Sequence, residues 1–454
     1  MALVRKEREI PVLKMCDVLV IGGGPAGLGA AVSAAREGMG VILLEKRAYL
    51  GGNITASYVE NCNYFLRNTP FKAEGLYAEI ERRCYEEYGN DNARAYNQKA
   101  FSSEYLKLFL DKLVQEEGIT VLFHALVNEV IMEGSSILGV IVQTKQGPQA
   151  IQAKQYIDTT GDADVAYASG VGYDQGREGD HLCQPGTVSL RLSGADTQKL
   201  LENGRDGLSE IGRQFKAAYR AGETALACKR QDLPFGRLTH GGLISYVNYS
   251  CAYGLDPTDI QDLSKGEMEC RTYVYDIYRY LKRTHDELKN IEIASIAPEI
   301  GFRDSRRIHG RYKLTIEDME SNRHFDDVIA VFPRFYDMLA PDAYMDGDGS
   351  VQGKGFAGHI YEHVVDERTF EIPYASLVPL GVDNLLVAGR CLSADHVAES
   401  GVRAISLCMM TGQGAGVGAA LAVKGACEPQ KVCIPELQDR LRSLGLQIPS
   451  KEGV

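Results

Sequence analysis

Histidines and arginines at residues 303–309, 359 and 396 are the side chains best suited to acid–base chemistry in this sequence. The densest stretch, residues 303–309, reads Arg-Asp-Ser-Arg-Arg-Ile-His, although the whole chain carries a net charge of −12. A histidine exchanges a proton near neutral pH, which makes it a candidate general acid or base. The candidate catalytic residues are Arg303, Arg306, His309, His359 and His396.

The arginines of residues 303–309 are costly to bury unless acidic side chains or an anionic ligand pair with them. If the stretch is extended, alternation places Arg303 and Arg307 on one face and Arg306 on the other. One face would then meet a ligand, while the other would hold two domains together. A guanidinium fork binds a carboxylate through two hydrogen bonds, so we expect a negatively charged substrate. The alternative is that the arginines only anchor acidic side chains across a domain interface.

A glycine-rich turn near the N-terminus has the form G-x-G-x-x-G, from Gly22 to Gly27. An apolar, β-branched run over residues 16–21 precedes it, and an alanine-rich helix over residues 26–37 follows it. A second buried strand over residues 41–44 ends at Glu45, where an acid can bind ribose hydroxyls. This complete βαβ context predicts a dinucleotide site, with the pyrophosphate at the helix N-terminus. Glu45 disfavours a 2′-phosphate, and hence NADP.

A Gly51-Gly52 pair follows Glu45 and allows the backbone to approach a second part of a large ligand. With it, the chain resembles FAD-dependent oxidoreductases of the glutathione-reductase and p-hydroxybenzoate-hydroxylase fold group. Further segments resemble a narrower family, called simply FAD-dependent oxidoreductase and related to one component of heterodisulfide reductase. These segments are residues 156–162, 298–310, 372–379, 384–394 and 410–416. The resemblance covers most of the chain and is thin between about 195 and 290.

The resemblance implies non-covalently bound FAD and a set of cofactor-binding residues. Asp162 has an alternative role as the cap of a helix that starts at Ala163, and Val127 an alternative as an ordinary strand residue. Gly401 begins the last helix, whose N-terminus would stabilise negative charge on the reduced flavin. Arg390 stands where many flavoproteins of the wider fold group have an aspartate. The full set is Gly22, Gly24, Pro25, Ala26, Gly27, Glu45, Lys46, Arg47, Gly51, Gly52, Asn53, Val127, Thr160, Gly161, Asp162, Gly389, Arg390 and Gly401.

The same resemblance adds side chains around the last helix to the candidates for contact with the flavin. Glu399, Ser400 and Arg403 follow His396 and precede or open that helix. Because the flavin carries the redox step, such groups position the substrate and tune the ring.

The fold class expected from these elements is α/β, a Rossmann-like FAD-binding domain with a parallel sheet, interrupted by an α+β substrate domain. We expect a discontinuous FAD-binding domain over residues 1–175 and 376–430, a substrate or cap domain over 176–375, and a helical tail over 431–454. Strands are expected at residues 119–123, 127–132, 137–144, 156–159 and 384–388. Helices are expected at residues 72–115, 268–288 and 400–425, the last as one unbroken helix, and a loop at 342–358.

Composition places the chain among ordinary globular enzymes, with 44% hydrophobic and 24% charged residues. Its eleven cysteines include no C-x-x-C pair, so a zinc ribbon, a thioredoxin-type pair and iron–sulfur ligation are not indicated. Two uncharged windows, residues 18–35 and 404–423, are rich in glycine and alanine and are interpreted as buried segments. Without a signal-peptide pattern at the N-terminus, we expect a cytoplasmic protein.

Three functions are compatible with these features. The first is an FAD-dependent oxidoreductase that transfers a hydride between the flavin and a small organic substrate, with a carboxylate-bearing one favoured by the arginines. The second, an NAD-dependent dehydrogenase, leaves Gly51-Gly52 and Gly389-Arg390 unexplained. The third, a flavin-bearing RNA-modification or interaction protein, is disfavoured by the net charge. We therefore expect a small-molecule substrate, an electron acceptor that the sequence does not identify, and no nucleic-acid or membrane partner. Homo-oligomers stay open.

Overall fold

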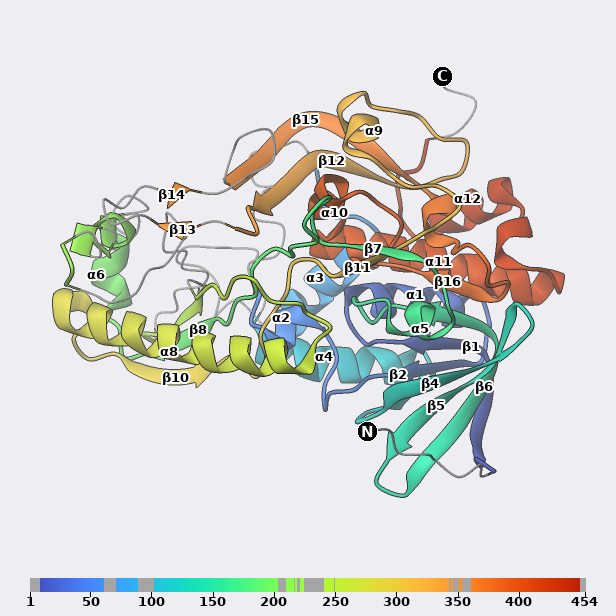
Figure 1. Cartoon of the computed structure of the whole chain (residues 1–454), viewed down its shortest axis with the longest axis horizontal. Helices are drawn as coiled ribbons and strands as arrows, with labels where there is room; N and C mark the ends of the chain where they lie inside the picture. Colours follow the sequence, from blue (N-terminus) through green and yellow to red (C-terminus); the bar gives the residue numbers. More distant parts are fainter. Residues whose placement is uncertain are drawn as a thin grey trace.

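The computed structural model describes residues 9–60, 71–88, 102–202, 210–215, 217–218, 221–223, 241–248, 250–342, 344–345, 351–352 and 361–449. One side of the molecule holds a large sheet with its helices, the other side holds the long helix α8, and a long hairpin arches over the top (Figure 1). The fold is of the α/β class, as expected from the sequence.

The large sheet has the strand order β3-β2-β1-β6-β5-β4, and β16 pairs with the end of β6. Strands β1, β2, β3, β6 and β16 run parallel, while β4 and β5 are antiparallel to their neighbours. The bounds are β1 Val12–Ile21, β2 Val41–Leu44, β3 Thr120–Leu122, β4 Leu126–Glu133, β5 Ser136–Thr144, β6 Gly147–Asp158 and β16 Leu385–Val387. Every strand expected in this part of the chain is confirmed. Strands β1 and β6 begin earlier than expected, because their first halves are more exposed than their ends and the prediction rested on buried apolar runs.

Two helices cover one face of the sheet and approach each other unusually closely. A Cβ atom on Gly412 of α11 (Ile405–Gly425) would lie 2.0 Å from the carbonyl oxygen of Ala26 in α1 (Pro25–Arg36). One on Gly416 would lie 2.3 Å from the oxygen of Ala30, and one on Gly29 would lie 2.2 Å from that of Met409. The two backbones therefore touch, which only glycine allows at these positions. Among the described residues α11 alone is long and apolar enough to cross a membrane, but 94% of that stretch is buried inside the fold.

The expectation of one unbroken helix over residues 400–425 is wrong. The structure has α10 (His396–Val402) and then α11, with Arg403 and Ala404 between them. The ψ angle of Ala404, 132°, is not helical. Asp395 starts the first helix early, since its side chain accepts hydrogen bonds from the amides of Val397 and Ala398. The break has a tertiary cause: it lets α10 pack against β12 while α11 packs against α1.

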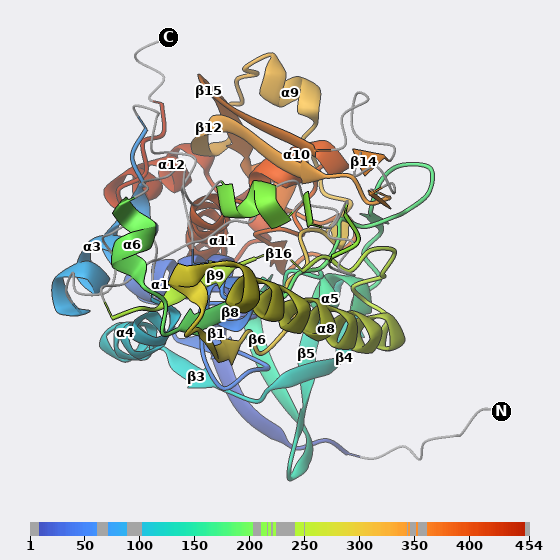
Figure 2. The ribbon, with the colours of Figure 1, turned by 90° about the vertical axis from the view of Figure 1, so that its left-hand side faces the viewer.

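The second lobe is built on a small antiparallel sheet and one long helix. Its strands β8 (Leu190–Ser193), β9 (Ile244–Val247) and β10 (Glu292–Ile296) have the order β10-β8-β9. Helix α8 (Ile260–Thr284) lies across the front of this lobe in Figure 2, with β8 and β9 beside it. The expected helix 268–288 is thus confirmed but displaced: it starts earlier, where Asp259 caps it, and ends at Thr284 before a short turn.

A long hairpin joins β12 (Val328–Leu339) to β15 (Tyr361–Pro373) above the sheet (Figure 1). Its apolar residues Ile329, Phe332 and Phe370 belong to the same buried core as α1 and α11. The hairpin, which lies inside the proposed 176–375 unit, therefore packs on the sheet. The domain boundaries themselves stay predictions.

Shorter elements complete the described chain. They are α2 Asn53–Ala56, α3 Gly75–Tyr88, α4 Ser103–Glu116, α5 Asp164–Ala168, β7 Tyr173–Gln175, α6 Thr197–Glu202, η2 Asp286–Leu288, β11 Arg306–Ile308, α9 Ile316–Glu320, β13 Tyr344–Met345, β14 Val351–Gln352, η3 Tyr374–Leu377, η4 Pro429–Lys431 and α12 Ile434–Ser443. The expected helical region 72–115 corresponds to α3 and α4, with residues 89–101 outside the description. Most of the expected loop 342–358 also lies outside it, and its described parts pair as β13 and β14.

Candidate active site

The carboxyl ends of three parallel strands bring distant parts of the sequence together. Ile21 of β1 and Val387 of β16 both lie opposite Asp158 of β6. Directly after Asp158, the Thr159 hydroxyl donates to the carbonyl oxygens of Ile21 and Gly22, at 2.8 Å each. Ligands of open α/β sheets bind at this edge, so the predicted motifs meet where the fold class places its sites.

The first glycine turn leaves room for backbone alone. Gly22 has a φ of +107°, and a Cβ atom there would lie 2.5 Å from the oxygen of Thr159. A Cβ atom on Gly27 would lie 1.8 Å from the oxygen of Gly22, so the helix fits against the turn only with glycine. Helix α1 then begins with Pro25 and Ala26, without a side-chain cap and without an acid in its first turn. This uncompensated positive helix end suits a pyrophosphate.

Glu45 is 2% exposed and is held by backbone amides. Its Oε2 accepts from the amide of Gly23 and its Oε1 from the amide of Arg47, each at 2.8 Å. Each oxygen keeps a second lone pair, which can accept from a ribose hydroxyl. The Arg47 side chain lies between two acids: its Nη1 is 3.5 Å from the Oε1 of Glu45, and its Nε donates to Glu299 of the second lobe at 2.8 Å, so it ties the two lobes together.

The second glycine turn lies directly against the first. The amide of Gly51 donates to the oxygen of Gly23 at 2.9 Å, and a Cβ atom on Gly52 would lie 2.9 Å from the Cα of Gly24. Both glycines have positive φ, and Asn53 then opens the short helix α2. The two predicted turns therefore form one continuous cradle of backbone.

Two further predicted cofactor-binding residues, Lys46 and Val127, lie in segments that adjoin Glu45. Lys46 follows Glu45 in the turn after β2, and Val127 lies in β4 opposite Val142. The amide of Ala125, just before β4, donates to the oxygen of Glu45 at 3.0 Å, which places the start of β4 beside the acid.

Asp162 does not cap the helix that follows it, so that alternative is wrong. Helix α5 starts at Asp164, and its first amides, of Val165 and Ala166, donate to the side chain of Asp158 at 2.9 Å each. The Asp158 carboxylate also accepts from the amide and the hydroxyl of Thr160. Asp162 instead pairs with Arg390, whose Nη2 lies 2.6 Å from its Oδ1.

Gly389 and Arg390 close the cradle from the C-terminal side. Gly389 has a φ of +85°, and a Cβ atom there would lie 2.8 Å from the side chain of Ala26. Its amide donates to the Thr411 hydroxyl at 3.1 Å. Next to it, the Nη2 of Arg390 lies 3.1 Å from the position a Cβ atom on Gly161 would take. Residues of three predicted motifs, 22–27, 160–162 and 389–390, thus lie against one another in the cradle.

Gly401 is not at a helix N-terminus, and this correction moves the expected charge-stabilising end. Gly401 lies near the end of α10, because Asp395 starts that helix at His396. The next N-terminus belongs to α11, after Ala404, and it too has no side-chain cap and no acid in its first turn. Any dipole effect on a flavin therefore comes from Ile405 onward.

The arginines of residues 303–309 contact mostly this chain's own backbone. Only residues 306–308 form a strand, so the expected alternation does not extend back to Arg303. The Nη1 of Arg303 donates to the oxygen of Pro185 at 2.9 Å, and the Nη1 of Arg306 donates to the oxygen of Asp162 at 3.1 Å. Arg307 is fully buried and donates to the oxygens of Ala394 and Gly176.

His309 is about half exposed, and its Nε2 lies 3.1 Å from an oxygen of Asp174. Among the other histidines of the candidate set, His359 lies outside the described residues. The catalytic roles of the set stay predictions.

His396 lies in a buried polar cluster beside the cradle. Its Nδ1 is 3.1 Å from the Oδ2 of Asp304, whose Oδ1 accepts from the amide of Gln184 at 2.8 Å. Glu399, one helical turn further along α10, is completely buried. Neither of its carboxyl oxygens has a hydrogen-bond partner in the described part of the chain, nor do the Nη1 of Arg390 and the Nε of Arg403.

The environment of Glu399 changes its acidity. Burial and the nearby Asp304 carboxylate raise the pKa of Glu399 to about 8. The sequence indicates Glu399 as one of several weaker candidates but does not reveal Asp304 as its neighbour. The spacing of His396 and Glu399 is the available signal, since residues three apart share a helix face.

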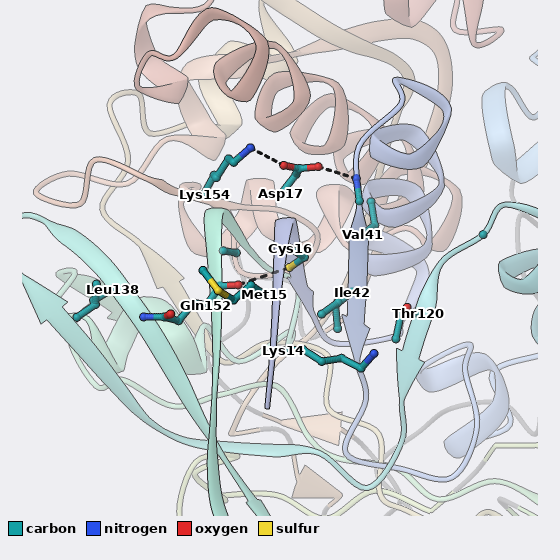
Figure 3. Close-up of a pocket in the computed structure, with 13 residues that line it drawn as sticks. Lys14, Met15, Cys16, Asp17, Val41, Ile42, Thr120, Leu138, Gln152 and Lys154 are labelled. Atoms are coloured by element: carbon teal, nitrogen blue, oxygen red, sulfur yellow. Dashed lines mark hydrogen bonds and ion pairs between the residues drawn. The ribbon is translucent and has the colours of Figure 1, made fainter. Parts of the chain in front are cut away.

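A separate cavity of 680 Å³ opens at the opposite, amino end of the parallel strands (Figure 3). Its lining includes Lys154, which forms an ion pair with Asp17 at 2.7 Å, and Cys16, which donates to the oxygen of Gln152. Burial raises the pKa of the Cys16 thiol to about 12, so it stays protonated and unreactive. Within the described residues no group of histidine, cysteine and acidic side chains has the arrangement of a metal site.

A family model described as FAD dependent oxidoreductase matches residues 17–441. A flavin-dependent halogenase of Armillaria mellea is 46% identical over 66 residues, 14% of this chain and 13% of the halogenase. A thiamine thiazole synthase of Aeropyrum pernix is 29% identical over 158 residues, 32% of this chain and 54% of the synthase.

The similarity to solved structures extends over more of the chain. A geranylgeranyl bacteriochlorophyll reductase-like protein of Thermoplasma acidophilum superimposes with a TM-score of 0.44 and 13% identity, over 95% of this chain and 83% of that one. By contrast, the aligned part of the chain spans about half, or less, of the length of the two curated relatives.

Proposed function

The chain belongs to the family of FAD-dependent oxidoreductases, and from this premise we propose that it transfers a hydride between bound FAD and a small organic substrate. When bound, FAD supplies the hydride acceptor or donor. The relatives named above carry out different reactions, so the substrate must be inferred from this chain's own residues.

The cradle residues suit the successive parts of FAD. The N-terminus of α1 and the backbone of Gly24 would hold the pyrophosphate, and the remaining lone pairs of Glu45 would accept from the ribose hydroxyls. Gly52 and Gly161 leave room for the rest of the cofactor, and the N-terminus of α11 would face negative charge on the reduced ring. A buried carboxylate at the ribose disfavours NADP.

The observation that carries the substrate proposal is the buried cluster of polar atoms without partners. The Nη1 of Arg390 and the Nε of Arg403 are donors that a carboxylate would satisfy, and Glu399 is a group that can exchange a proton. These three groups together support a small organic acid with a hydroxyl or amino group, rather than a neutral polyol. A small-molecule substrate, without nucleic acid or membrane as a partner, is part of the same proposal.

An anaerobic substrate screen tests this proposal by following the bleaching of the flavin. The panel contains small hydroxy and amino acids, together with neutral polyols of equal size. We expect the acids to bleach the flavin and the polyols to leave it oxidised, and the reverse pattern would contradict the proposal.

A matched pair of variants connects the result to the cluster. Arg403→Lys should raise KM for the acid without changing FAD content, because lysine keeps the charge but loses the fork. Arg213→Lys, at an exposed site, should leave KM unchanged. Equal KM values in both variants would show that Arg403 does not bind the substrate.

A further inference from the structure

Glu399 is a buried acid for which the fold supplies no hydrogen-bond partner among the described residues. Its side chain has no exposed surface, and both carboxyl oxygens are unpartnered there. Leaving a buried polar group without a partner costs free energy, so such a group in a folded protein calls for a functional explanation. Ordinary packing of α10 would be served better by an apolar side chain.

Charged groups surround Glu399, yet each of the three arginines is bonded elsewhere. Arg307 donates to backbone carbonyls, Arg390 pairs with Asp162, and Arg403 donates to the backbone oxygen of Asp337 on β12. The charged groups that act on Glu399 are Asp304, Arg307, Arg390 and Arg403, and Glu399 in turn acts on Cys408. Beyond them, Asp337 pairs with Arg403 and His396 pairs with Asp304. Because none of the arginines neutralises Glu399 through a direct bond, burial dominates its behaviour.

This balance sets the protonation of Glu399 close to the working pH. Burial acts first and Asp304 second to raise the pKa of Glu399 to about 8, and the arginines oppose them. The group is therefore mainly protonated at neutral pH, when it can give a proton, and the ionised fraction that can take one up grows as the pH rises towards 8. A pKa near the operating pH is what acid–base catalysis requires.

One side chain connects Glu399 to the cofactor cradle. Arg390 pairs with Asp162 at 2.6 Å and lies against Gly161, while the preceding residue, Gly389, lies against Ala26 at the start of α1. Arg390 is also among the groups that act electrostatically on Glu399. A change of charge in the cradle is thus felt at Glu399.

We propose that Glu399 is the proton-holding residue of this site, which takes up the proton that the substrate loses as its hydride leaves. The inference rests on the proposed function. The substrate C–H bond breaks as a hydride to FAD, its O–H or N–H bond breaks as a proton, and a C=O or C=N bond forms. The ionised form of the Glu399 carboxylate takes up this proton. In the reverse reaction Glu399 returns it. His396, one helical turn earlier, has its Nδ1 3.1 Å from Asp304.

The reduction potential of the FAD-bound enzyme tests this without any substrate. Reduction adds negative charge to the cradle, so Glu399 should bind a proton more tightly in the reduced enzyme. With dithionite and redox dyes, the potential of the native enzyme should depend more steeply on pH above about 8. Glu399→Gln should lack this steepening, and Glu399→Asp should restore it in part. An identical pH dependence in native and Glu399→Gln enzymes would overturn the proposal.

Infrared difference spectra of the oxidised enzyme give a second measurement. A protonated carboxyl band should disappear as the pH rises through about 8, and Glu399→Gln should lack that band. Asp304→Asn should move the transition to lower pH, because it removes the carboxylate that raises the pKa of Glu399. Glu178→Gln, at an exposed position, is the control and should behave as the native enzyme does. A band that is unaffected by Glu399→Gln would overturn the assignment.

The outcomes separate this inference from the proposed function. If acids bleach the flavin but the potential shows no Glu399-dependent steepening, the function stands and the proton-holding role falls. If the steepening is present and no acid bleaches the flavin, the role of Glu399 stands and the substrate class is wrong.

Discussion

Glu45 and Asp158 in the cofactor cradle contrast with Glu399 in the neighbouring cluster, although all three acids are buried. Glu45 accepts two backbone hydrogen bonds, and Asp158 accepts from three amides and one hydroxyl. Glu399 accepts none from the described residues. Burial raises the pKa of Asp158 as well, but there the hydrogen bonds act in the opposite direction.

The contrast separates two uses of a buried carboxylate. In the cradle, the acids join strand ends to helix starts, and their bonds hold the glycine turns in one conformation. In the cluster, the acid joins none of the described elements, so its oxygens are available to a proton. A buried acid with partners thus stabilises the fold, and one without partners adds to function at a cost in stability.

Gly27→Ala should have the largest effect, because it breaks the cradle itself. The new methyl group would lie 1.8 Å from the oxygen of Gly22, which cannot move without breaking the turn. We expect a loss of roughly 5 kcal/mol or more in the free energy of unfolding, measured by urea titration.

Gly24→Ala is the matched control for Gly27→Ala. Its methyl group meets only the Cα of Gly52, at 3.7 Å, so the protein should fold but lose FAD. Equal stability of native and Gly27→Ala proteins would show that the cradle is not tightly packed.

Glu399→Gln should stabilise the FAD-bound protein at alkaline pH. The folded pKa of Glu399 is above the ordinary glutamate value of 4.5, so native stability relative to the variant falls as the pH rises from about 4.5 to about 8. Above that range the difference should be on the order of 5 kcal/mol, measured by urea titration across pH. A difference that does not vary with pH would contradict the raised pKa.

Glu45→Gln should weaken FAD binding by about 1–3 kcal/mol, because charge-assisted bonds to the ribose are lost. The fold should survive, since the amide oxygen can still accept from Gly23 or Arg47. FAD affinity measured by fluorescence titration checks this. Unchanged affinity would mean that Glu45 serves only the turn, as Asp158 does.

Arg306→Lys should cost about 1 kcal/mol of stability and leave flavin reduction intact. The guanidinium lies 4.2 Å from the ring centre of Tyr167 and bonds to Asp162 and Asp164, so its loss is a packing effect. Thermal unfolding and anaerobic flavin reduction measure the two effects separately. A slow reduction with normal FAD content would support the predicted catalytic role of Arg306 instead.

His309→Ala should have the smallest effect, within about 0.5 kcal/mol, because the side chain is 48% exposed. Its contact with Asp174 is an exposed pair, which contributes little. The same two measurements apply, and a large loss of activity would support the predicted catalytic role of His309.

Local sequence signals are sufficient to predict the cradle. The strand over residues 41–44, the glycine turn and Glu45 are all predictable because each depends on neighbours within one βαβ unit. The break between α10 and α11 is not, since Ala404 has no helix-breaking side chain and the break follows from packing against β12 and α1.

The cluster is predictable only in part, for a related reason. His396 and Glu399 share one helix, and their spacing is visible in the sequence. Asp304 comes from a distant segment and lies within an arginine-rich run, where its neighbours are the expected partners. The capping of α5 by Asp158 instead of Asp162 also depends on where β6 ends. Contacts of this kind are set by tertiary structure alone.

The backbone contact between α1 and α11 also governs the order in which the protein can be assembled during synthesis. Helix α1 leaves the ribosome early, but its partner surface begins at Ile405. Until then, the face of α1 that carries Gly29 is not packed against α11. The apolar α11 is in turn buried only once it packs into the fold. We therefore expect FAD to bind only after α11 has been made, and we expect incomplete chains to expose surfaces that favour aggregation and chaperone binding.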